Sequence, residues 1–367
     1  MTMTFRHGHN CADGPLVCVI AGDDAAPEVV LPTVELLHEL VPGIRFRQAL
    51  SGRAAEEKYG DPFPKETRQL IAAADCTVFG ASGGPSRPVL WHLRWGMQTA
   101  VNVRPVRWQQ GYRSPLSHPE RINYVIVRDN LEGLYPPREG DLSELTALPS
   151  SASWYLPPGA GEQGAYAVRI CTDEQIRRVA QAAIHVAYER QSLGSPGRVT
   201  LGAKYSIQPR TDGRFRQIVR ELVEAKAGLT YQEFLTDDLA RRMVAEPETL
   251  DVVVLNNEHG DILADLAAGC IGGLGLAPSV CYGQDYAYFE PVHGSAPDLA
   301  GKHIINPTAM LLTGALLLDY LGYMREKEQL EEAVARVYRQ GKVLTPDQGG
   351  SASTGEFFAA VRAALQS

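Results

Sequence analysis

The stretch "LVCVIAGDDAAPEVVLPTVELLHELV" (16–41) decides the class of fold. Residues 16–22 form a short apolar run typical of a buried strand, and the part that begins at Pro27 has the apolar spacing of a helix. The same alternation continues downstream, where the helix-prone "PKETRQLIAAA" (64–74) leads into the strand-like "CTVFGASGGP" (76–85). Alternating strands and helices indicate an α/β architecture with a mainly parallel sheet.

The rest of the chain predicts a second unit of strands and helices. The stretch 140–170, rich in Pro, Gly, Ser and Tyr, predicts strands and loops, with an arm exchanged with a partner subunit. A helix over 173–190 has Asp173 as its expected N-cap. The other expected elements are strands at 124–130, 198–206 and 250–257, a helix at 236–247, and a nearly all-apolar, hence buried, helix at 307–322.

Composition limits the class of protein. The chain has 367 residues, 44% of them hydrophobic and 21% charged, so two globular domains are expected. The net charge of −8 argues against nucleic acid or an anionic membrane as a partner. The six cysteines form no CxxC pair, the N-terminal residues lack the apolar core of a signal peptide, and no apolar run approaches the roughly 20 residues that span a bilayer. We expect a cytoplasmic protein with reduced cysteines.

Three acidic residues are candidates for a metal site. Asp261 and Asp265 lie four residues apart in "NNEHGDILADLAAG" (256–269), on one face of a predicted helix, and Asp237 lies in the helix-prone "LTDDLARRMV". Carboxylates without a matching His or Cys cluster suit a hard divalent ion such as Mg²⁺ or Mn²⁺. On spacing alone, a solvated acidic helix face is the more favoured interpretation.

Three arginines and two isolated polar residues form the second set of candidates. Arg94, Arg104 and Arg128 include two in β-prone apolar surroundings, where an unpaired guanidinium is costly. Such a trio could hold a dicarboxylic acid, since each planar fork fits a carboxylate. Structural ion pairs are the competing interpretation, and the residues alone favour it. Lys204, at the end of a strand, and Tyr135, after a turn, could serve as acid or base, but neither is informative by itself.

The glycine-rich stretches do not fit the standard Rossmann fingerprint. Neither "GDDAAPE" (22–28) nor "GGLGLAP" (272–278) contains the G-x-G-x-x-G pattern after a strand. The stretch "PVHGSAPDLAG" (291–301) contains a tight turn ending in Asp298, which could wrap a nucleotide with backbone groups. The alternative is an ordinary loop.

Taken together, segments in register over nearly the whole chain resemble the β-decarboxylating dehydrogenases, the isocitrate/isopropylmalate dehydrogenase family with its tartrate and D-malate members. The segments are "GDDAAPE" (22–28), "LRWGMQTAVNVRPV" (93–106), "VRDNLEGLY" (127–135), "VTLGAKYSIQPRTDGRF" (199–215), "TDDLARRMV" (236–244), "NNEHGDILADLAAGCIGGLGLAPS" (256–279), "EPVHGSAPDLAGKHIINP" (290–307) and "LTPDQGGSAST" (344–354). The resemblance implies a two-domain α/β fold distinct from Rossmann, with the active site in the interdomain cleft of a homodimer. It implies a larger domain with the nucleotide site (1–109 plus 272–367) and a smaller one with the dimer interface and arm (110–271).

The resemblance also implies roles for individual residues. Arginines 94, 104 and 128 become the clamp on the malate moiety, and Tyr135 and Lys204 become the general acid–base pair. The metal ligands become Asp237, Asp261 and Asp265, with Lys204 and Asp237 supplied by the partner subunit. The nucleotide site is implied at His293, Gly294, Ser295, Ala296, Asp298 and Asn306. An acidic residue at Asp298 implies NAD, because it accepts from ribose hydroxyls and repels a 2′-phosphate.

Several positions depart from the family pattern. Asp24 and Ala26 stand where glycines are usual, so the backbone path of that loop is expected to differ. Ser206 replaces an asparagine that normally touches the nicotinamide end, Leu266 replaces an acid beside the metal ligands, and Arg241 replaces a common methionine.

The segment "SRPVLWH" (86–92) belongs to the region that recognises the C3 substituent of the substrate. Here Arg87, Leu90 and Trp91 replace the aliphatic and acidic residues of isopropylmalate enzymes. Arg87 suits an anionic substituent, whereas Trp91 suits an aromatic one or fills space beside an unsubstituted C3. The expected function is NAD- and Mg²⁺- or Mn²⁺-dependent oxidative decarboxylation of D-malate or a 3-substituted malate. The alternative is a non-catalytic regulatory subunit of the same family.

Overall fold

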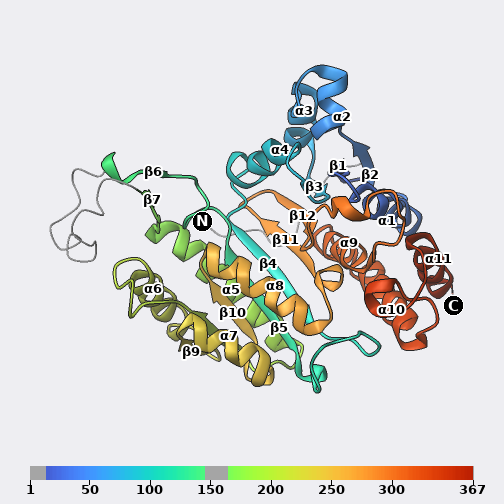
Figure 1. Cartoon of the computed structure of the whole chain (residues 1–367). Helices are drawn as coiled ribbons and strands as arrows, with labels where there is room; N and C mark the ends of the chain where they lie inside the picture. The colour runs from blue at the N-terminus through green and yellow to red at the C-terminus, as the bar shows by residue number, and fades with distance from the viewer. Residues whose placement is uncertain (1–13, 145–163, 367) are drawn as a thin grey trace.

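The structure is a computed structural model and describes residues 14–144 and 164–366. The N-terminal stretch with Cys11 and the centre of the expected arm (145–163) lie outside these residues. One large sheet organises the molecule (Figure 1), with strand order β2-β1-β3-β12-β11-β4-β5-β10-β8-β9. Its strands are β1 (Leu16–Ile20), β2 (Arg45–Gln48), β3 (Cys76–Phe79), β4 (Val101–Arg107), β5 (Asn123–Asp129), β8 (Arg198–Gly202), β9 (Thr230–Phe234), β10 (Val252–Leu255), β11 (Pro278–Tyr282) and β12 (Ala287–Pro291).

The sheet is parallel at both ends and antiparallel in its centre. The strands β2, β1, β3 and β12 are parallel to one another, as are β5, β10, β8 and β9. Between these groups, β11 and β4 run antiparallel to their neighbours. Residues 1–109 and 272–367 contribute β1–β4, β11 and β12 to this sheet, and residues 110–271 contribute β5 and β8–β10. A mixed α/β fold with a mainly parallel sheet is therefore confirmed, with an antiparallel centre that the sequence pattern did not indicate.

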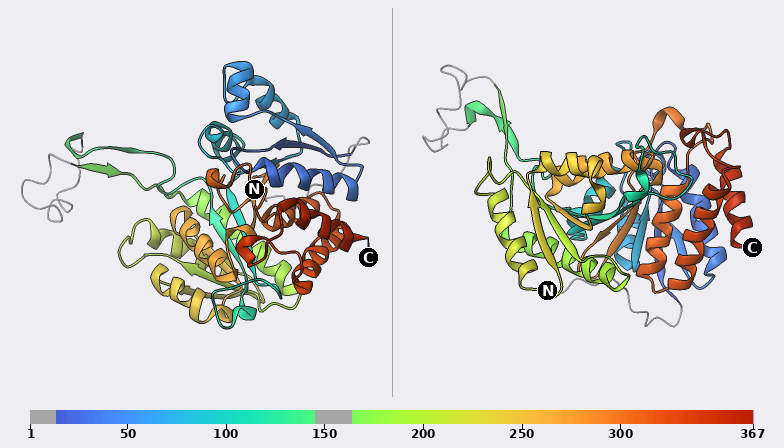
Figure 2. Two further views of the ribbon diagram at one scale, coloured as in Figure 1. Left: turned by 45° about the vertical axis from the view of Figure 1, so that its right-hand side comes forward. Right: turned by 90° about the horizontal axis from the view of Figure 1, so that it is seen from below.

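Helices cover both faces of the sheet (Figure 2). Beside β5 and β8–β10, α5 and α6 lie on one face, and α7 and α8 lie on the other. On the remaining part, α9 packs on β11 and β12 and also contacts α1 and α10. The bounds are α1 (Pro27–Leu40), α2 (Gly52–Tyr59), α3 (Lys65–Ala73), α4 (Arg87–Trp91), α5 (Asp173–Ser192), α6 (Asp212–Glu224), α7 (Thr236–Ala245), α8 (Asn257–Ile271), α9 (Thr308–Tyr320), α10 (Met324–Gln340) and α11 (Thr354–Leu365). No helix in the described ranges is both long and apolar enough to cross a membrane.

Two sequence expectations about helices can be checked directly. The nearly all-apolar α9 is buried along most of its length, as expected. The expected N-cap of α5 was wrong by one residue: Thr172 is the cap, and its hydroxyl accepts from the backbone N–H of Gln175 at 3.3 Å. Asp173 instead begins the helix and pairs with Arg214. An acidic residue in the first turn still complements the helix dipole there.

The described ends of the expected arm form a two-stranded antiparallel ribbon. This ribbon pairs β6 (Glu139–Asp141) with β7 (Ala165–Ala167) and projects from the body of the molecule (Figure 1). The predicted exchange of this arm with a partner subunit remains a prediction. The cysteines in the described ranges are all free thiols: Cys18, Cys76, Cys171, Cys270 and Cys281.

Asp129, the last residue of β5, is a buried carboxylate that holds the turn after the strand. Its Oδ1 accepts from the backbone N–H groups of Leu131 at 2.9 Å and Glu132 at 3.2 Å, and from Nε2 of Gln175 at 2.8 Å. Burial nevertheless raises the pKa of Asp129 from 3.8 to about 6. The folded state therefore holds this proton more tightly than the unfolded state does.

The variant Asp129→Asn should be more stable than the native chain above pH 6. The sign follows from the raised pKa: stability falls as pH rises from about 3.8 to about 6, because the fold then carries a buried charge. Asparagine keeps the accepting oxygen without that charge, so the free energy of unfolding should rise by about 2–3 kcal/mol at pH 7.5. Urea unfolding at pH 7.5 and pH 4 measures this, with no gain expected at pH 4. The exposed Asp285→Asn is the control, and an equal gain at both pH values would contradict the argument.

Candidate active site

The pairing of β4 and β5 places two arginines on one face of the sheet. Asn102 of β4 lies directly opposite Arg128 of β5, and Arg104 is two residues from Asn102 on the same strand. Residues opposite one another in an antiparallel pair point to the same face, as do residues two apart. Oδ1 of Asn102 accepts from Nε of Arg104 at 2.7 Å and fixes its direction. Both guanidinium groups therefore project from the face that α8 covers.

One face of α8 meets these arginines. Asn257, Asp261 and Asp265 are spaced by four residues and lie on one side of the helix. Oδ1 of Asn257 accepts from Nε of Arg128 at 3.0 Å and from Nη2 at 2.6 Å, while Nη1 of Arg128 donates to Asp261. Arg104 lies 3.6 Å from Asp261 and 3.6 Å from Asp265. The arginines and the two aspartates predicted from sequence thus form one cluster.

Arg94 reaches the cluster from a π-helical turn, η1 (His92–Gly96), which continues α4. Its guanidinium carbon lies 5.9 Å from the centre of the Tyr135 ring. Such turns carry an extra residue, re-aim the side chain, and are often found at functional sites. Nε of Arg94 and Nη1 of Arg104 are buried and have no hydrogen-bond acceptor among the described residues. Each nitrogen can take a hydrogen-bond acceptor, while Nη1 of Arg104 also lies 3.6 Å from Asp265.

Tyr135 lies between the arginines and Asp261. Its hydroxyl donates to Oδ2 of Asp261, and the guanidinium carbon of Arg128 lies 5.0 Å from its ring centre. Burial and the hydrogen bond to Asp261 raise the pKa of Tyr135 to about 12, against the opposing effect of Arg128. The hydroxyl therefore keeps its proton at neutral pH and can donate it.

The two aspartates of α8 have opposite electrostatic environments. Burial favours a neutral Asp261, but Arg128, Tyr135 and Arg104 outweigh that effect and lower its pKa. Burial raises the pKa of Asp265, and the negative charge of Asp261 adds to the rise, although Arg104 opposes it. The ionised form is thus favoured at Asp261 and disfavoured at Asp265, each relative to an ordinary aspartate. A cation between the two would favour the ionised form of both.

Gly260 sets the distance between α8 and β5. A Cβ at this position would lie 2.5 Å from Cγ and 2.9 Å from Cβ of Arg128, whose side chain is 0% exposed and has no room to retreat. The backbone of α8 can therefore approach the arginine only because residue 260 lacks a side chain.

The variant Gly260→Ala should lower kcat/KM by roughly 100-fold, the cost of misplacing a substrate-binding group by about an ångström. Steady-state kinetics with a 2-hydroxy acid substrate measure the loss. Gly269→Ala is a matched control on the same helix, because a Cβ there meets no atom within 4 Å. Equal kinetics of the two variants would show that Arg128 is not held by this contact.

Lys204 and Asp237 form a separate pair. They follow β8 and β9, and Nζ of Lys204 donates to Oδ1 of Asp237 at 2.7 Å. The hydrogen bond from Lys204 lowers the pKa of Asp237. Across residues 14–144 and 164–366, no three His, Cys, Asp or Glu side chains lie close enough together to hold a metal ion. Asp237 therefore does not join Asp261 and Asp265 within one chain.

A cavity of about 470 Å³ lies beside the loop 291–301. It is lined by most of the residues predicted for the nucleotide: His293, Gly294, Ser295, Ala296 and Asn306. Nδ1 of His293 contacts the Gly294 carbonyl at 3.0 Å, and its buried Nε2 has no partner in the described structure. Asp298 is exposed, lies on η8 (Pro297–Leu299), and does not line this cavity.

Asp347 is a cavity residue that sequence reasoning missed. It lies on η9 (Pro346–Gln348), and its Oδ2 accepts from Nδ2 of Asn306 at 2.9 Å. Thr345 donates to its Oδ1 at 2.6 Å. The signal was present in "LTPDQGGSAST" (344–354), one of the family-like segments, but nothing in that segment distinguished this aspartate from an ordinary turn residue.

Comparison with known proteins agrees with this geometry. The profile of the family described as isocitrate/isopropylmalate dehydrogenase matches residues 16–361. The chain belongs to this family. The 3-isopropylmalate/3-methylmalate dehydrogenase of Methanocaldococcus jannaschii is 36% identical over 340 residues, which is 93% of this chain and 96% of the relative. The isocitrate/homoisocitrate dehydrogenase of Thermus thermophilus is 36% identical over 358 residues, covering 96% and 98% of the two chains.

A solved structure shows the same fold. The crystal structure of isocitrate dehydrogenase from Methylococcus capsulatus superposes with a TM-score of 0.84 at 32% identity, covering 96% of this chain and 100% of that one. The protein is thus an oxidative decarboxylating dehydrogenase of the isocitrate/isopropylmalate dehydrogenase family, whose members act on small hydroxy acids.

The loop 22–28 of this family member contains one non-glycine residue in the left-handed conformation. Asp24 has φ of 50°, a conformation that aspartate tolerates better than most residues, whereas Ala26 is right-handed at −57°. Ala25 then donates to the Ser295 carbonyl at 3.0 Å and ties the loop to the cavity. A Cβ on Gly83 would lie 2.2 Å from the Asp24 carboxylate, so a larger residue there would displace that side chain.

The other departures have simple surroundings. Leu266 packs against the hydrophobic core. The acidic side chain that the family usually has at this position is therefore missing beside Asp265. Arg241 is an exposed residue paired with Asp238 at 2.9 Å, and Ser206 is exposed.

The residues expected at the C3 substituent lie on α4, which leads directly into η1. Arg87 is exposed, and its guanidinium makes no ion pair with another described residue. Leu90 is half-buried, while Trp91 is 46% exposed, with its ring centre 6.3 Å from that of Trp95.

Proposed function

We propose that this dehydrogenase oxidatively decarboxylates D-malate or a 3-substituted malate, with NAD as oxidant and Mg²⁺ or Mn²⁺ as activator. The observation that carries the proposal is the convergence of Arg94, Arg104 and Arg128 on one site, where two buried guanidinium nitrogens have no described acceptor. A substrate with two carboxylates supplies those acceptors, because each guanidinium group can bind one carboxylate through two parallel hydrogen bonds. A substrate without a carboxylate would offer these two buried N–H groups no charged acceptor.

The chain's own residues would handle the protons. Lys204 would accept the proton of the C2 hydroxyl, directly or through water, while Asp237 orients the lysine through its hydrogen bond. Tyr135 would deliver a proton to the carbon that has lost CO₂, consistent with a hydroxyl that remains protonated at neutral pH. The arginine clamp would hold the carboxylates through both steps.

The donor set around α8 suits a hard divalent ion. Asp261 and Asp265 offer oxygen ligands one helical turn apart, and Asp237 would supply the third. When bound, the ion would neutralise charge on the substrate oxygens, and NAD would accept the hydride. NAD would occupy the cavity at His293 and Asn306, with the exposed Asp298 near its ribose hydroxyls.

We further propose a homodimer in which Lys204 and Asp237 act on the partner's arginine cluster. The position of Asp237 supports this: it holds Lys204, but within the described chain it does not form a three-acid group with Asp261 and Asp265. The larger domain would comprise 1–109 plus 272–367 and the smaller one 110–271, with the cleft between them.

Initial rates of NAD reduction test the function. The panel comprises D-malate, tartrate, isocitrate, homoisocitrate, and 3-alkyl- and 3-arylmalates, each with and without Mn²⁺. We expect Mn²⁺-dependent turnover of at least one malate derivative and no comparable rate with NADP. Retained ligand binding without turnover of any of them would instead support the alternative of a non-catalytic regulatory subunit. That alternative is disfavoured because Tyr135, Lys204, the three aspartates and the three arginines are all present.

A further inference from the structure

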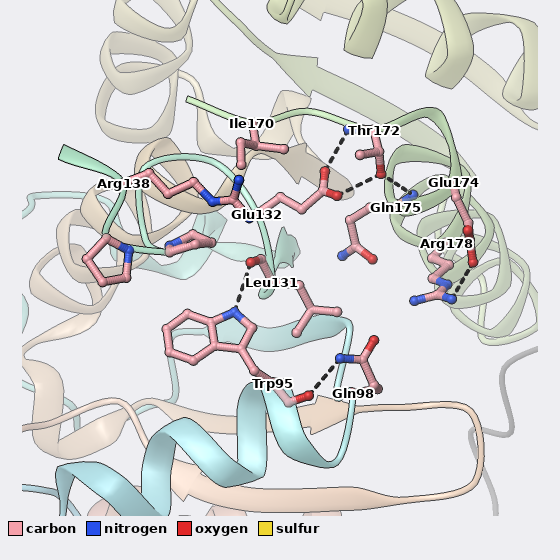
Figure 3. A pocket seen from close by; sticks show the side chains of 12 residues that line it. Trp95, Gln98, Leu131, Glu132, Arg138, Ile170, Thr172, Glu174, Gln175 and Arg178 are labelled. Carbon is pink, nitrogen blue, oxygen red and sulfur yellow. Dashed lines mark hydrogen bonds and ion pairs between the residues drawn. The ribbon is translucent and has the colours of Figure 1, made fainter. Parts of the chain in front are cut away.

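A pocket of about 560 Å³ lies behind the loop that carries Tyr135 (Figure 3). Its walls come from η1, from the loop 131–138, and from the first turns of α5 with the residues just before it. None of the residues assigned above to hydroxy acid, metal or nucleotide lines it. The loop 131–138 thus lines this pocket and also carries Tyr135, which contacts Asp261. Its volume falls within the range of small-molecule sites, about 300–1,000 Å³.

Gln175 lines the pocket and carries an unsatisfied acceptor. This side chain is 3% exposed, and its Nε2 donates to the Ala100 carbonyl at 2.7 Å and to Oδ1 of Asp129 at 2.8 Å. Because both of those partners are acceptors, the amide orientation is determined and Oε1 must be the other atom. Oε1 is buried and accepts no hydrogen bond from any described residue. A ligand with an N–H donor would satisfy it.

Among the described residues that line the pocket, one acidic and one basic side chain form no ion pair. Glu174 and Arg178 pair with each other along α5. Glu132 accepts from the backbone N–H and the hydroxyl of Thr172, both at 2.7 Å, but forms no ion pair in the described chain. Arg138 also lacks an ion-pair partner among the described residues.

Most of the remaining wall is apolar, with Gln98 as a polar exception. Trp95, Leu131, Pro136 and Ile170 line it, and the indole of Trp95 lies along one side of the space (Figure 3). An occupant should thus combine an apolar body with a donor-bearing cationic end and an anionic end.

We propose that this pocket is a second site, which takes a zwitterionic α-amino acid with an apolar side chain. The ammonium group binds Oε1 of Gln175 and Glu132, the carboxylate binds Arg138, and the side chain packs on Trp95. A ligand with only one of the two charges leaves either the acceptor or the guanidinium without a partner.

Binding there opposes substrate binding. The indole N–H of Trp95 donates to the Leu131 carbonyl at 3.0 Å and joins η1 to the loop. Trp95 is adjacent to Arg94 in the chain, and Pro136 is adjacent to Tyr135. A ligand bound between Trp95 and the loop shifts Arg94 and Tyr135, so the amino acid raises the KM for the hydroxy acid. By linkage, the hydroxy acid weakens amino acid binding by the same factor. This kinetic effect rests on the proposed function, whereas binding itself does not.

The test uses L-phenylalanine as probe, with 3-phenylpropionate and phenethylamine as its singly charged analogues. Calorimetry on the full chain without substrate should show L-phenylalanine binding about tenfold more tightly than either analogue. Initial rates should show a roughly fivefold rise in KM for the hydroxy acid, with kcat retained. Absence of binding heat at about 10 mM L-phenylalanine, enough to saturate a site with Kd of 1 mM, would overturn the proposal.

Two variants locate the site. Arg138→Gln changes an exposed side chain and should weaken L-phenylalanine binding about tenfold, as should Gln175→Leu. Arg177→Gln is the matched control, because Arg177 is exposed on α5 but does not line the pocket. Binding that is equal in wild type and Arg138→Gln overturns the proposal even if Gln175→Leu does not fold. If no hydroxy acid is turned over, the proposed function fails, and calorimetry still decides the binding site.

Discussion

Replacing Asp261 by asparagine should lower kcat/KM about 10³-fold or more, equivalent to roughly 4 kcal/mol of transition-state stabilisation. The carboxylate accepts from Arg128 through one oxygen and from Tyr135 through the other. Asparagine offers one acceptor and turns an NH₂ group toward a second donor. The fully buried Arg128 then loses its charged partner, and the proposed metal site loses one oxygen ligand.

Steady-state kinetics and Mn²⁺ titration by calorimetry measure both consequences. Binding of NAD alone should be unchanged, since Asp261 does not line the cavity at His293. Asp238→Asn is the control, because Asp238 is a carboxylate on α7 whose ion-pair partners in the described part of the chain are Arg241 and Arg242. Near-native Mn²⁺ affinity in Asp261→Asn would remove this aspartate from the metal site.

The second large effect is expected for Lys204→Ala. Removing a general base typically costs 10²–10⁴-fold, so kcat should fall by about 10³-fold while KM changes little. An added primary amine such as methylamine should restore part of the rate, which a merely structural lysine would not allow. Lys226→Ala, at an exposed lysine after α6, is the control. Wild-type rates in Lys204→Ala would refute the assigned role.

The two inactive variants together test where Lys204 acts. In a mixed dimer of Lys204→Ala and Asp261→Asn chains, one site keeps native Asp261 and receives native Lys204 from the partner. The other site carries both changes. Random mixing should therefore restore about a quarter of native activity, since about half of the dimers are mixed and each has one intact site. If both residues act within one chain, mixing restores nothing.

Much of this site was predictable because it depends on local patterns. The four-residue spacing of Asp261 and Asp265 gave one helix face, and Arg104 and Arg128 lay in strands whose apolar neighbours made an unpaired charge unfavourable. What the residues alone left open was the choice between a metal and a solvated face, because spacing does not reveal what packs opposite. The family resemblance favoured the metal, and the structure added the arginine contacts.

The missed features depend on distant contacts or on small changes in backbone geometry. Apolar periodicity does not reveal the direction of a strand, so the antiparallel β4 and β11 were not expected. The π-helical turn that aims Arg94 differs from an α-helix by one residue per turn, too little to register in so short a segment. Asp347 meets Asn306 across 41 residues of sequence, and only the folded chain brings them together.

Within the described chain Asp237 holds Lys204 but does not join Asp261 and Asp265, and this has a consequence for how the enzyme responds to dilution. If each site is completed by a neighbouring chain, an isolated protomer has no turnover at all. Specific activity should then decrease as the protein is diluted through the dissociation constant of the dimer, and rise again when substrate is added first. Abundance in the cell would thus set not only how much enzyme there is, but what fraction of it is competent.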